Sequence, residues 1–455
     1  MIGLIETKAE AQPSSSTPQK KPPVINKMSP VSQKKPMIRK LSPASQKKPV
    51  VRKVSPIPQK LSPTVHKLSS VSQKPLPVIH KLSPVPSQLS SAPQSPAPQN
   101  ISAVISKFEQ HLIKAIKQNR VPGCAVAIVY KNQVVFMNGY GVRALGKKEK
   151  IDLDTVFQLG SVSKPIAATL ATILQNQGLL NINDPVEHYL PNFTLKGAKQ
   201  PKSLTIKHVL SHTTGLPRAG FNNLIESHAP HSRIIRTLQT TPVRSAIGKK
   251  YDYNNAMFSL ISEITMATTR KTFHDSLANY LLKPLNMTRT TSTYEGLMRT
   301  ENRASPHVKH KKGIFQCCPI YSKGYYAVAP AGGVNSSVRD MATFLKAQMG
   351  SFPHILNNQA LARLHQPLIP TPRNSLGSYD GPRERIKNAQ YGLGWRILQF
   401  NQQKLVFHGG WLKGFTNFVA FLPEHQVGIV ILQNAENRFA SKTAMRFFDI
   451  FLGLR

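Results

Sequence analysis

A serine and a lysine three residues apart, Ser161 and Lys164, form the first pair in this sequence that could carry out nucleophilic chemistry. Residues at this spacing share one face of a helix, so the lysine amine can approach the serine hydroxyl. A lysine buried near other cationic groups loses its proton near neutral pH, and its free amine can then activate a hydroxyl. Gly160 precedes the pair and an apolar segment typical of a helix follows it. We therefore expect Ser161 at a helix N-terminus, where free N–H groups favour developing negative charge.

The spacing alone is not specific, because it also occurs at 32–35 and 45–48, inside a proline-rich segment. The alternative is that Ser161 caps the helix and Lys164 is a solvated charge. The preceding glycine and the following helix are what distinguish position 161.

A tyrosine and an asparagine, Tyr253 and Asn255, stand just before another apolar segment further along the chain. A tyrosine in this place can shuttle a proton, and Asn255 can hold a substrate amide or the lysine amine. The alternative is a loop tyrosine followed by an asparagine that caps the helix.

A histidine and two glycines, His408 to Gly410, follow a strand-like segment that ends at Phe407. Glycines beside a cleft let a substrate lie against the backbone, and the next N–H group, from Trp411, can donate a hydrogen bond to an oxyanion. The alternative is a hairpin turn in which the histidine has no chemical role.

In order and spacing, these motifs resemble those of the class C β-lactamase-like serine hydrolases, which are grouped with penicillin-binding proteins and related esterases and D-aminopeptidases. The three motifs are Ser161-x-x-Lys164, Tyr253-x-Asn255 and His408-x-Gly410. Further stretches that resemble the same family are Val121–Gly123, Leu204–Pro217, Ala331–Gly333, Tyr391–Trp395 and Gly410–Phe415. The resemblance covers roughly residues 101–450.

The resemblance implies an α/β, β-lactamase/transpeptidase-like fold, in which helices flank an antiparallel sheet. It implies one hydrolase domain over 101–455, with a helical lobe over roughly 165–350. It implies neither a cofactor nor a metal. The residues to which it gives catalytic roles are Ser161, Lys164 and Tyr253. The residues to which it gives substrate or oxyanion contacts are Asn255, His408, Gly410 and Trp411.

The expected reaction is acyl transfer in two halves. Ser161 attacks a carbonyl after Lys164 and Tyr253 take its proton, and the N–H groups of Ser161 and Trp411 hold the oxyanion. Tyr253 then returns a proton to the leaving group, and water releases the acyl-enzyme. The sequence has no Gly-x-Ser-x-Gly motif, which argues against the α/β-hydrolase alternative.

The third motif departs from the β-lactamase pattern, because His408 stands where β-lactamases carry a lysine and Gly409 replaces a threonine. A lysine stays charged and helps to hold a substrate carboxylate, whereas a histidine is mostly neutral at pH 7. This argues against true β-lactam hydrolysis. The expected substrate is an ester, an amide or a peptide, such as a D-amino-acid-containing peptide, an ester or a β-lactam-like compound.

The elements that must position these residues follow from the apolar periodicity. A helix-spaced stripe predicts a helix over 101–119, and a tight turn at Lys131 and Asn132 is expected to join two strands. Further strands are expected at 394–398, 404–407, 415–422 and 426–432, and a closing helix over 436–455. Strands at both ends with helices between them imply an α/β lobe and a helical lobe, with the catalytic groups in the cleft between them.

Three other histidines receive no chemical role from the pattern. His212 and the turn at 213–215 match the family, and we interpret them as structural. His307 and His310 lie in a lysine-rich loop and are expected to be exposed to solvent.

The first hundred residues differ in composition from the rest. They hold eighteen of the 36 prolines and no Phe, Trp or Tyr, and Ser-Pro steps and Ser-Gln-Lys-Lys-Pro blocks recur along them. Such a segment cannot bury enough apolar surface to offset its ordering entropy, so residues 1–100 are predicted to form a disordered basic tail. Of the formal net charge of +40, the tail carries +14 and the remainder +26.

Two interpretations of the tail remain open. It is either a spacer or an electrostatic tether to an anionic polymer or a membrane surface. The lack of aromatic residues argues against specific nucleic-acid recognition. The alternative for the whole chain is accordingly a catalytically weak scaffold, or a protein that binds an anionic polymer through its tail.

The cysteines and the possible targeting segments say little more about the class of protein or its location in the cell. Cys124, Cys317 and Cys318 make no disulfide framework, and the sequence has no CxxC or HExxH spacing and no apolar run long enough to cross a membrane. The family resemblance favours a periplasmic, cell-envelope or secreted protein. A genuine start at Met1 without an export signal would instead favour the cytoplasm.

Overall fold

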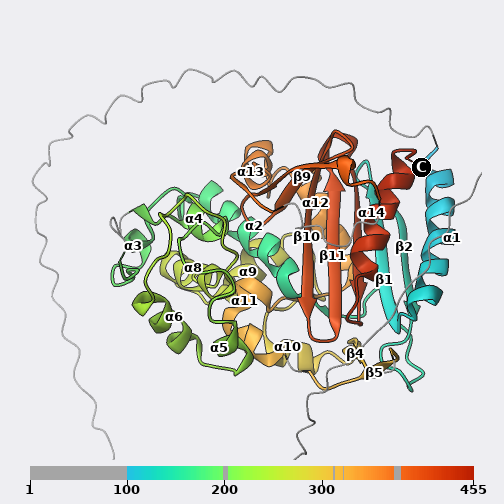
Figure 1. Cartoon of the computed structure of the whole chain (residues 1–455), viewed down its shortest axis with the longest axis horizontal. Coiled ribbons are helices and arrows are strands. Elements are labelled where there is room, and N and C mark those ends of the chain that lie inside the picture. Colours follow the sequence, from blue (N-terminus) through green and yellow to red (C-terminus); the bar gives the residue numbers. More distant parts are fainter. Residues whose placement is uncertain (1–99, 198–202, 311–312, 321, 373–380, 455) are drawn as a thin grey trace, which may run out of the picture. The chain divides into compact units, whose positions relative to one another are not determined.

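The computed structural model describes residues 100–197, 203–310, 313–320, 322–372 and 381–454. The predicted tail, apart from its last residue, therefore lies outside the described residues. An antiparallel sheet with the strand order β2-β1-β12-β11-β10-β9-β8-β7 runs through the described part, and helices cover both of its faces (Figure 1). Its strands are β1 (Gly123–Tyr130), β2 (Gln133–Gly141), β7 (Ile369–Pro370), β8 (Ile386–Tyr391), β9 (Arg396–Phe400), β10 (Gln403–Leu412), β11 (Phe415–Leu422) and β12 (Val427–Gln433).

Strands from the two ends of the described chain meet inside this sheet. β1 pairs with β12 in an antiparallel register in which Val126 lies opposite Ile431. The predicted hairpin between β1 and β2 is confirmed, and both Lys131 (φ 45°) and Asn132 (φ 67°) adopt left-handed backbone conformations. Two such residues make the turn whose twist matches that of the flanking strands.

One face of the sheet is covered by α1 (Ile101–Asn119) and α14 (Phe439–Phe451) (Figure 1). The helix predicted over 101–119 is confirmed, and its apolar stripe turns Phe108 and Leu112 towards the core. The Phe108 ring meets the ring of Phe447 edge-on, with centroids 5.3 Å apart. The predicted closing helix is present as well.

The other face is covered by α2 (Ser163–Asn176) and α12 (Val338–Gln348). Every side chain of α2 from Ser163 to Leu174 is buried. A helix that is buried all round belongs in the core of a protein. Accordingly, α2 lies between the sheet and a group of short helices (Figure 1).

These short helices form the helical insertion that the sequence predicts between the two groups of strands. The remaining described α-helices are α3 (Val186–Tyr189), α4 (Ile206–Leu210), α5 (Asn222–Glu226), α6 (His231–Thr240), α7 (Asn255–Phe258), α8 (Ile261–Thr269), α9 (Phe273–Leu277), α10 (Tyr294–Arg299), α11 (Ala329–Gly332) and α13 (Asn358–Leu364). Two small strand pairs are β3 (Phe157–Gln158) with β6 (Asn335–Ser336), and β4 (His307–Lys309) with β5 (Phe315–Cys317). None of the helices in the described ranges is long and apolar enough to cross a membrane.

The edge of the sheet was not predictable from the apolar pattern, which indicates no strand between 350 and 394. β7 and β8 nevertheless lie there and extend the sheet beyond β9. The pairing of β8 with β9 shifts register between Lys387 and Gln390, and Asn388 has a φ of 50°. A bulged strand with mostly polar side chains has no clean alternation to reveal it.

The expected exposure of His307 is wrong, whereas His310 is exposed as predicted. His307 lies in β4 and is fully buried. Its Nδ1–H donates a hydrogen bond to the Asn434 carbonyl at 2.8 Å, and its Nε2 accepts one from the Leu145 N–H at 3.0 Å. His307 and Lys309 are two residues apart and so share one face of β4, and the two ends of this short strand differ in exposure.

Candidate active site

Ser161 lies in a short 3-10 turn, Gly160–Val162, that leads directly into α2. Gly160 has a φ of 56°, a conformation that glycine adopts without strain. A Cβ atom at this position would lie 3.0 Å from the Trp411 backbone nitrogen, so the turn also packs closely against β10. The predicted position of Ser161 at a helix N-terminus is confirmed.

Lys164 lies in the first turn of α2 and is fully buried. Its Nζ donates hydrogen bonds to Asn255 Oδ1 and to the Ala331 carbonyl, both at 2.7 Å. The same Nζ is 3.3 Å from Ser161 Oγ. A neutral amine has two N–H groups and one lone pair, and this arrangement uses both N–H groups and leaves the lone pair for the serine hydroxyl.

Burial lowers the pKa of Lys164 well below its ordinary value, and the positive charge of Arg396 lowers it further. No carboxylate in the described ranges lies within 4.0 Å of the amine to oppose this effect. An unprotonated Lys164 can accept the proton of Ser161, which a solvated lysine cannot do at neutral pH.

Tyr253 approaches the serine from the other side. Its hydroxyl donates a hydrogen bond to Ser161 Oγ at 2.8 Å. Burial raises the pKa of Tyr253, so the phenol keeps its proton at neutral pH. Asn254, and not Asn255, caps α7, because its side chain accepts from the Met257 N–H at 2.9 Å. Asn255 is therefore left to contact Lys164.

β10 forms the opposite wall of the site. Its pairing with β9 ends where Phe407 lies opposite Arg396, so the segment from His408 onward runs past the end of β9. A Cβ atom at Gly410 would collide with the Leu159 carbonyl, so β10 can approach the Ser161 turn only because this residue is a glycine. The Trp411 side chain points outward and is 52% exposed, while its backbone nitrogen lies beside Gly160.

His408 is buried and makes two hydrogen bonds that fix its tautomer. Its Nδ1–H donates to the Gly409 carbonyl at 2.8 Å, so Nε2 accepts from the Tyr391 hydroxyl at 3.1 Å. Burial lowers the pKa of His408 well below its ordinary value, and Arg396 and Lys164 act in the same direction. A histidine in this place therefore adds no positive charge to the site.

A cavity of about 370 Å³ opens at Ser161. It brings together Ser161, Tyr253, His408, Gly410 and Trp411, and Lys164 and Asn255 lie directly behind Ser161. All seven site residues that the sequence indicates are thus gathered at one place in the fold.

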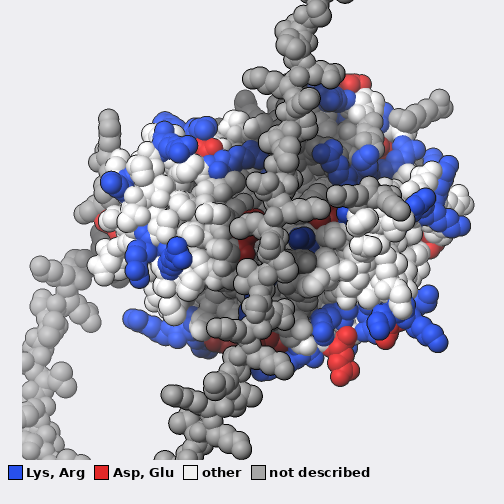
Figure 2. Space-filling model, turned by 60° about the horizontal axis from the view of Figure 1, so that its bottom comes forward, with Lys and Arg blue, Asp and Glu red and all other residues white. Residues whose placement is uncertain are grey.

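Three arginines in the wall of this cavity were missed by the sequence analysis: Arg218, Arg396 and Arg438. The Arg396 guanidinium lies 5.6 Å from the ring centroids of both Tyr253 and Tyr391. No Asp or Glu of the described residues lines the cavity. Arg218 and Arg396 each directly follow a recognised stretch, at 204–217 and 391–395, whereas Arg438 stands at a helix start with no such signal. Lys and Arg also outnumber Asp and Glu on the visible surface in Figure 2.

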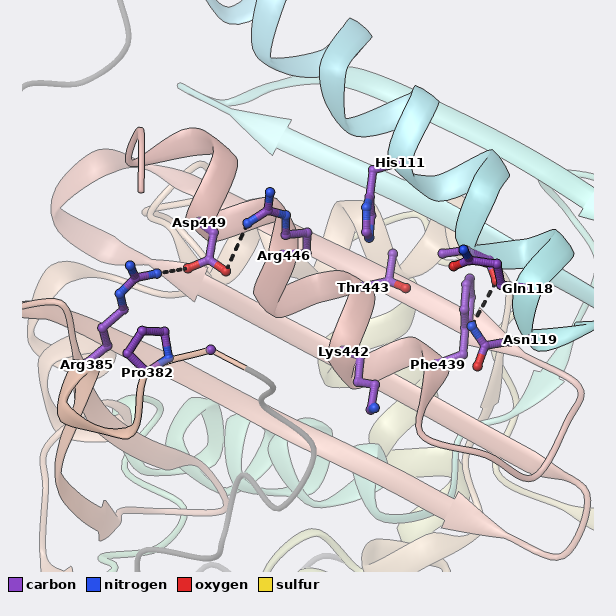
Figure 3. Close-up of a pocket in the computed structure, with 12 residues that line it drawn as sticks. His111, Gln118, Asn119, Pro382, Arg385, Phe439, Lys442, Thr443, Arg446 and Asp449 are labelled. Carbon is purple, nitrogen blue, oxygen red and sulfur yellow. Dashed lines mark hydrogen bonds and ion pairs between the residues drawn. The ribbon is translucent and has the colours of Figure 1, made fainter. Parts of the chain in front are cut away.

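A second cavity, of about 430 Å³, lies between α1 and α14 (Figure 3). His111 and Gln118 of α1 line it on one side, and Arg446 of α14 lines it on the other. Arg385 donates to Asp449 Oδ1 at 3.2 Å, and Arg446 lies 3.8 Å from the other carboxylate oxygen. None of the seven indicated site residues lines this cavity.

We predict that Gly410→Ala lowers turnover by about 10-fold or more, because the added methyl group must push β10 away from the Ser161 turn. A misplacement of this kind, of about 1 Å, costs on the order of 10²-fold in other enzymes. Gly409→Ala is the matched control, since its Cβ would meet Phe418 at 3.6 Å, an ordinary contact. Steady-state kinetics of both variants check the prediction, and equal losses would contradict it.

The sequence profile of the Beta-lactamase family matches residues 106–450 of this chain. Protein flp of Staphylococcus aureus (strain MRSA252) is 26% identical over 332 residues, which are 72% of this chain and 62% of that protein. Unguisins hydrolase ungD' of Aspergillus campestris (strain IBT 28561) is 24% identical over 349 residues, which are 74% of this chain and 63% of that protein. The chain thus spans less than two thirds of the length of these curated relatives.

Solved structures share the fold. The octameric penicillin-binding protein homologue from Pyrococcus abyssi superposes with a TM-score of 0.68 at 23% identity, over 77% of this chain and 78% of that chain. D-alanine carboxypeptidase AmpC from Burkholderia cenocepacia superposes with a TM-score of 0.60 at 22% identity, over 77% of this chain and 99% of that chain. The family match contains all three motifs that meet at the cavity. The resemblance is therefore confirmed, and the chain belongs to the Beta-lactamase family.

Proposed function

We propose that this protein is a serine hydrolase that cleaves an ester, amide or peptide bond through an acyl-enzyme on Ser161. The observation that supports this most directly is the environment of Lys164, a fully buried amine with two carbonyl acceptors and a serine oxygen around it. Burial and the nearby Arg396 favour its neutral form, and a neutral amine beside a hydroxyl is a general base.

In the acylation step, the Ser161 proton moves to Lys164 Nζ while Oγ forms a bond to the substrate carbonyl carbon. The bond from that carbon to the leaving group then breaks, and the leaving group takes the hydroxyl proton of Tyr253. The proton held by Lys164 restores the tyrosine. A water molecule repeats the sequence in the second half, and its attack on the acyl carbon releases Ser161.

Negative charge on the reacting oxygen is stabilised by backbone N–H groups in this proposal. The Ser161 N–H lies at the start of α2, where the helix dipole favours negative charge. The Trp411 nitrogen lies next to the same turn, on the edge of β10. Donors of this kind are part of the rigid backbone, so they need little reorganisation when the charge develops.

The substrate that fits this cavity best carries a negative charge close to the scissile bond. Arg218 and Arg396 both line the cavity, and neither pairs with a carboxylate within the described ranges. Arginine binds carboxylates with two parallel hydrogen bonds. These arginines would supply the positive charge that the neutral His408 does not.

We predict that Arg396→Gln lowers kcat/KM for an ester that bears a free carboxylate by about 10- to 100-fold, in line with the ~1.5–3 kcal/mol of a hydrogen bond to a charged group. The matched substrate is the same ester with its carboxylate methylated. Arg396 also acts on the pKa of Lys164, but that effect applies equally to both substrates. An equal loss for the two esters would therefore contradict the role in charge recognition.

The proposed function is tested by labelling with a fluorophosphonate probe and by a turnover screen over D-peptides, short esters and chromogenic β-lactams. We expect the label on the peptide that contains Ser161. A folded protein that takes no label and turns over none of these substrates would instead favour the scaffold alternative.

A further inference from the structure

His212 lies at the end of α4 and has a left-handed backbone conformation with a φ of 58°. A residue other than glycine with this conformation is uncommon, and at a buried position the surrounding structure must maintain it. His212 is only 1% exposed. The residue therefore holds a strained turn in the interior, directly behind the tyrosine of the site.

The turn holds the backbone on both sides of Tyr253. The Asp252 N–H donates to the His212 carbonyl at 2.9 Å, and the Asn254 N–H donates to His212 Nδ1 at 3.3 Å. The Tyr253 carbonyl accepts from the Ala219 N–H at 2.8 Å. One histidine thus binds the peptide groups that precede and follow the tyrosine.

The ring of His212 also packs on the ring of Tyr253. Their centroids are 4.3 Å apart, and the planes are inclined by 41°. The histidine ring also contacts the rings of Phe258 and Tyr391, with centroids at 5.2 and 5.0 Å. The phenol ring is therefore supported by a second ring that cannot move without displacing the core.

Hydrogen bonding defines the tautomer of His212. Because Nδ1 accepts from Asn254, the ring proton lies on Nε2, and no hydrogen-bond acceptor for it is found within the described part of the chain. Burial lowers the pKa of His212 well below its ordinary value, and the positive charge of Arg396 acts in the same direction. The ring therefore remains neutral, and Nδ1 stays available as an acceptor.

We propose that His212 is a positioning residue that holds the Tyr253 hydroxyl on Ser161, through the Nδ1 acceptor for Asn254 and through its left-handed turn. This inference rests on the proposed function, because it assigns to His212 the placement of the acid that protonates the leaving group. His212 itself does not line the cavity, since it lies behind Tyr253 and its other contacts are with the core.

Two substitutions separate the ring of His212 from its hydrogen-bond acceptor and its left-handed turn. In His212→Asn the side-chain oxygen takes the place of Nδ1, and asparagine tolerates the left-handed conformation well. In His212→Phe the ring is kept and the acceptor is lost. His365→Phe is the matched control, because His365 is also buried against aromatic rings, with Phe421 at 5.0 Å, and it bonds Gln348 rather than a residue of the site.

The measurement is the single-turnover acylation rate on an anilide, whose leaving group needs a proton, and on a nitrophenyl ester, whose leaving group does not. We expect His212→Phe to lower the anilide rate by about 10- to 100-fold and the ester rate by less than about threefold. We expect His212→Asn to stay within about fivefold of wild type on both substrates. We expect His365→Phe to lower thermal stability and leave the anilide-to-ester ratio unchanged.

A double variant tests whether His212 acts through the tyrosine. In a Tyr253→Phe background, His212→Phe should add less than about a twofold further loss on the anilide. Additive losses would overturn the proposal, and so would equal losses on the two substrates or equal losses in the Asn and Phe variants of His212.

Hydrogen exchange of the Asn254 amide separates this proposal from the proposed function. We expect the amide to be protected in the wild type and in His212→Asn, and to exchange about tenfold faster in His212→Phe. If the wild type turns over neither substrate, the proposed function fails and the exchange rates alone decide the positioning role. Unchanged exchange in His212→Phe would overturn it.

Discussion

Replacing Ser161 with alanine is expected to lower turnover by a factor on the order of 10⁴–10⁶, because the hydroxyl that lies beside Lys164 Nζ and forms the acyl-enzyme in the proposed mechanism is lost. The hydroxyl is removed, while the turn, the helix N-terminus and the arginines remain. Labelling by a fluorophosphonate should disappear together with turnover. Steady-state kinetics and intact-protein mass spectrometry measure the two effects on the same sample.

Ser163→Ala is the matched control for this prediction. Ser163 is fully buried, and its Oγ accepts a hydrogen bond from the Val334 N–H at 3.0 Å. Its loss should lower the unfolding free energy by about 1–3 kcal/mol and leave turnover within about threefold of wild type. Comparable losses of turnover in the two variants would show that Ser161 is not the nucleophile.

Lys164→Met should lower turnover by about 10²–10⁴-fold, the range for a positioned general base. Methionine fills much of the same volume without an amine, so the comparison isolates the base. In the wild type, the rate should rise with pH as Lys164 loses its proton, with a midpoint well below the ordinary lysine pKa of 10.5. A pH–rate profile with its midpoint near 10.5 would contradict this account.

The pH dependence of the unfolding free energy gives a second measure of the protonation state of Lys164. The pKa of Lys164 is lower in the folded chain than in the unfolded one, so the unfolded chain binds more protons between those two values. The unfolding free energy of the wild type, measured relative to Lys164→Met, should therefore rise with pH across that window. A flat difference would show that Lys164 is an ordinary charged lysine in the folded protein.

The parts of the fold that could be predicted are the helices and strands whose apolar residues recur at a regular spacing. The stripe of α1, the hairpin at Lys131 and Asn132, and the strands β11 and β12 all bury one face or both, so their patterns carry a clear signal. The strand β8, next to the edge strand β7, buries little and bulges at Asn388, so its pattern gives almost no signal.

The residues of the candidate site also divide into those that the sequence reveals and those that only the folded chain reveals. Ser161 and Lys164 could be found because their relation is set by one helical turn. Arg218 and Arg438 reach the same cavity from segments far apart in the chain, and neither lies inside one of the three motifs, although Arg218 directly follows the recognised stretch at 204–217. The sequence suggests a structural role for His212, and only the folded chain reveals that this role concerns Tyr253.

The partners of Lys164 have a consequence for how this protein matures. Asn255 and Ala331 lie 91 and 167 residues further along the chain, so the amine meets both of them only after long loops have closed. A chain in which α2 has formed but the lobes have not yet docked still exposes the amine to water, and there it stays charged. In the proposed mechanism, the serine of such an immature chain has no general base, and surrounding metabolites should not acylate it. Under this proposal, we expect covalent reactivity at Ser161 to report the completion of tertiary assembly, so that a probe of that reactivity counts mature molecules rather than total protein.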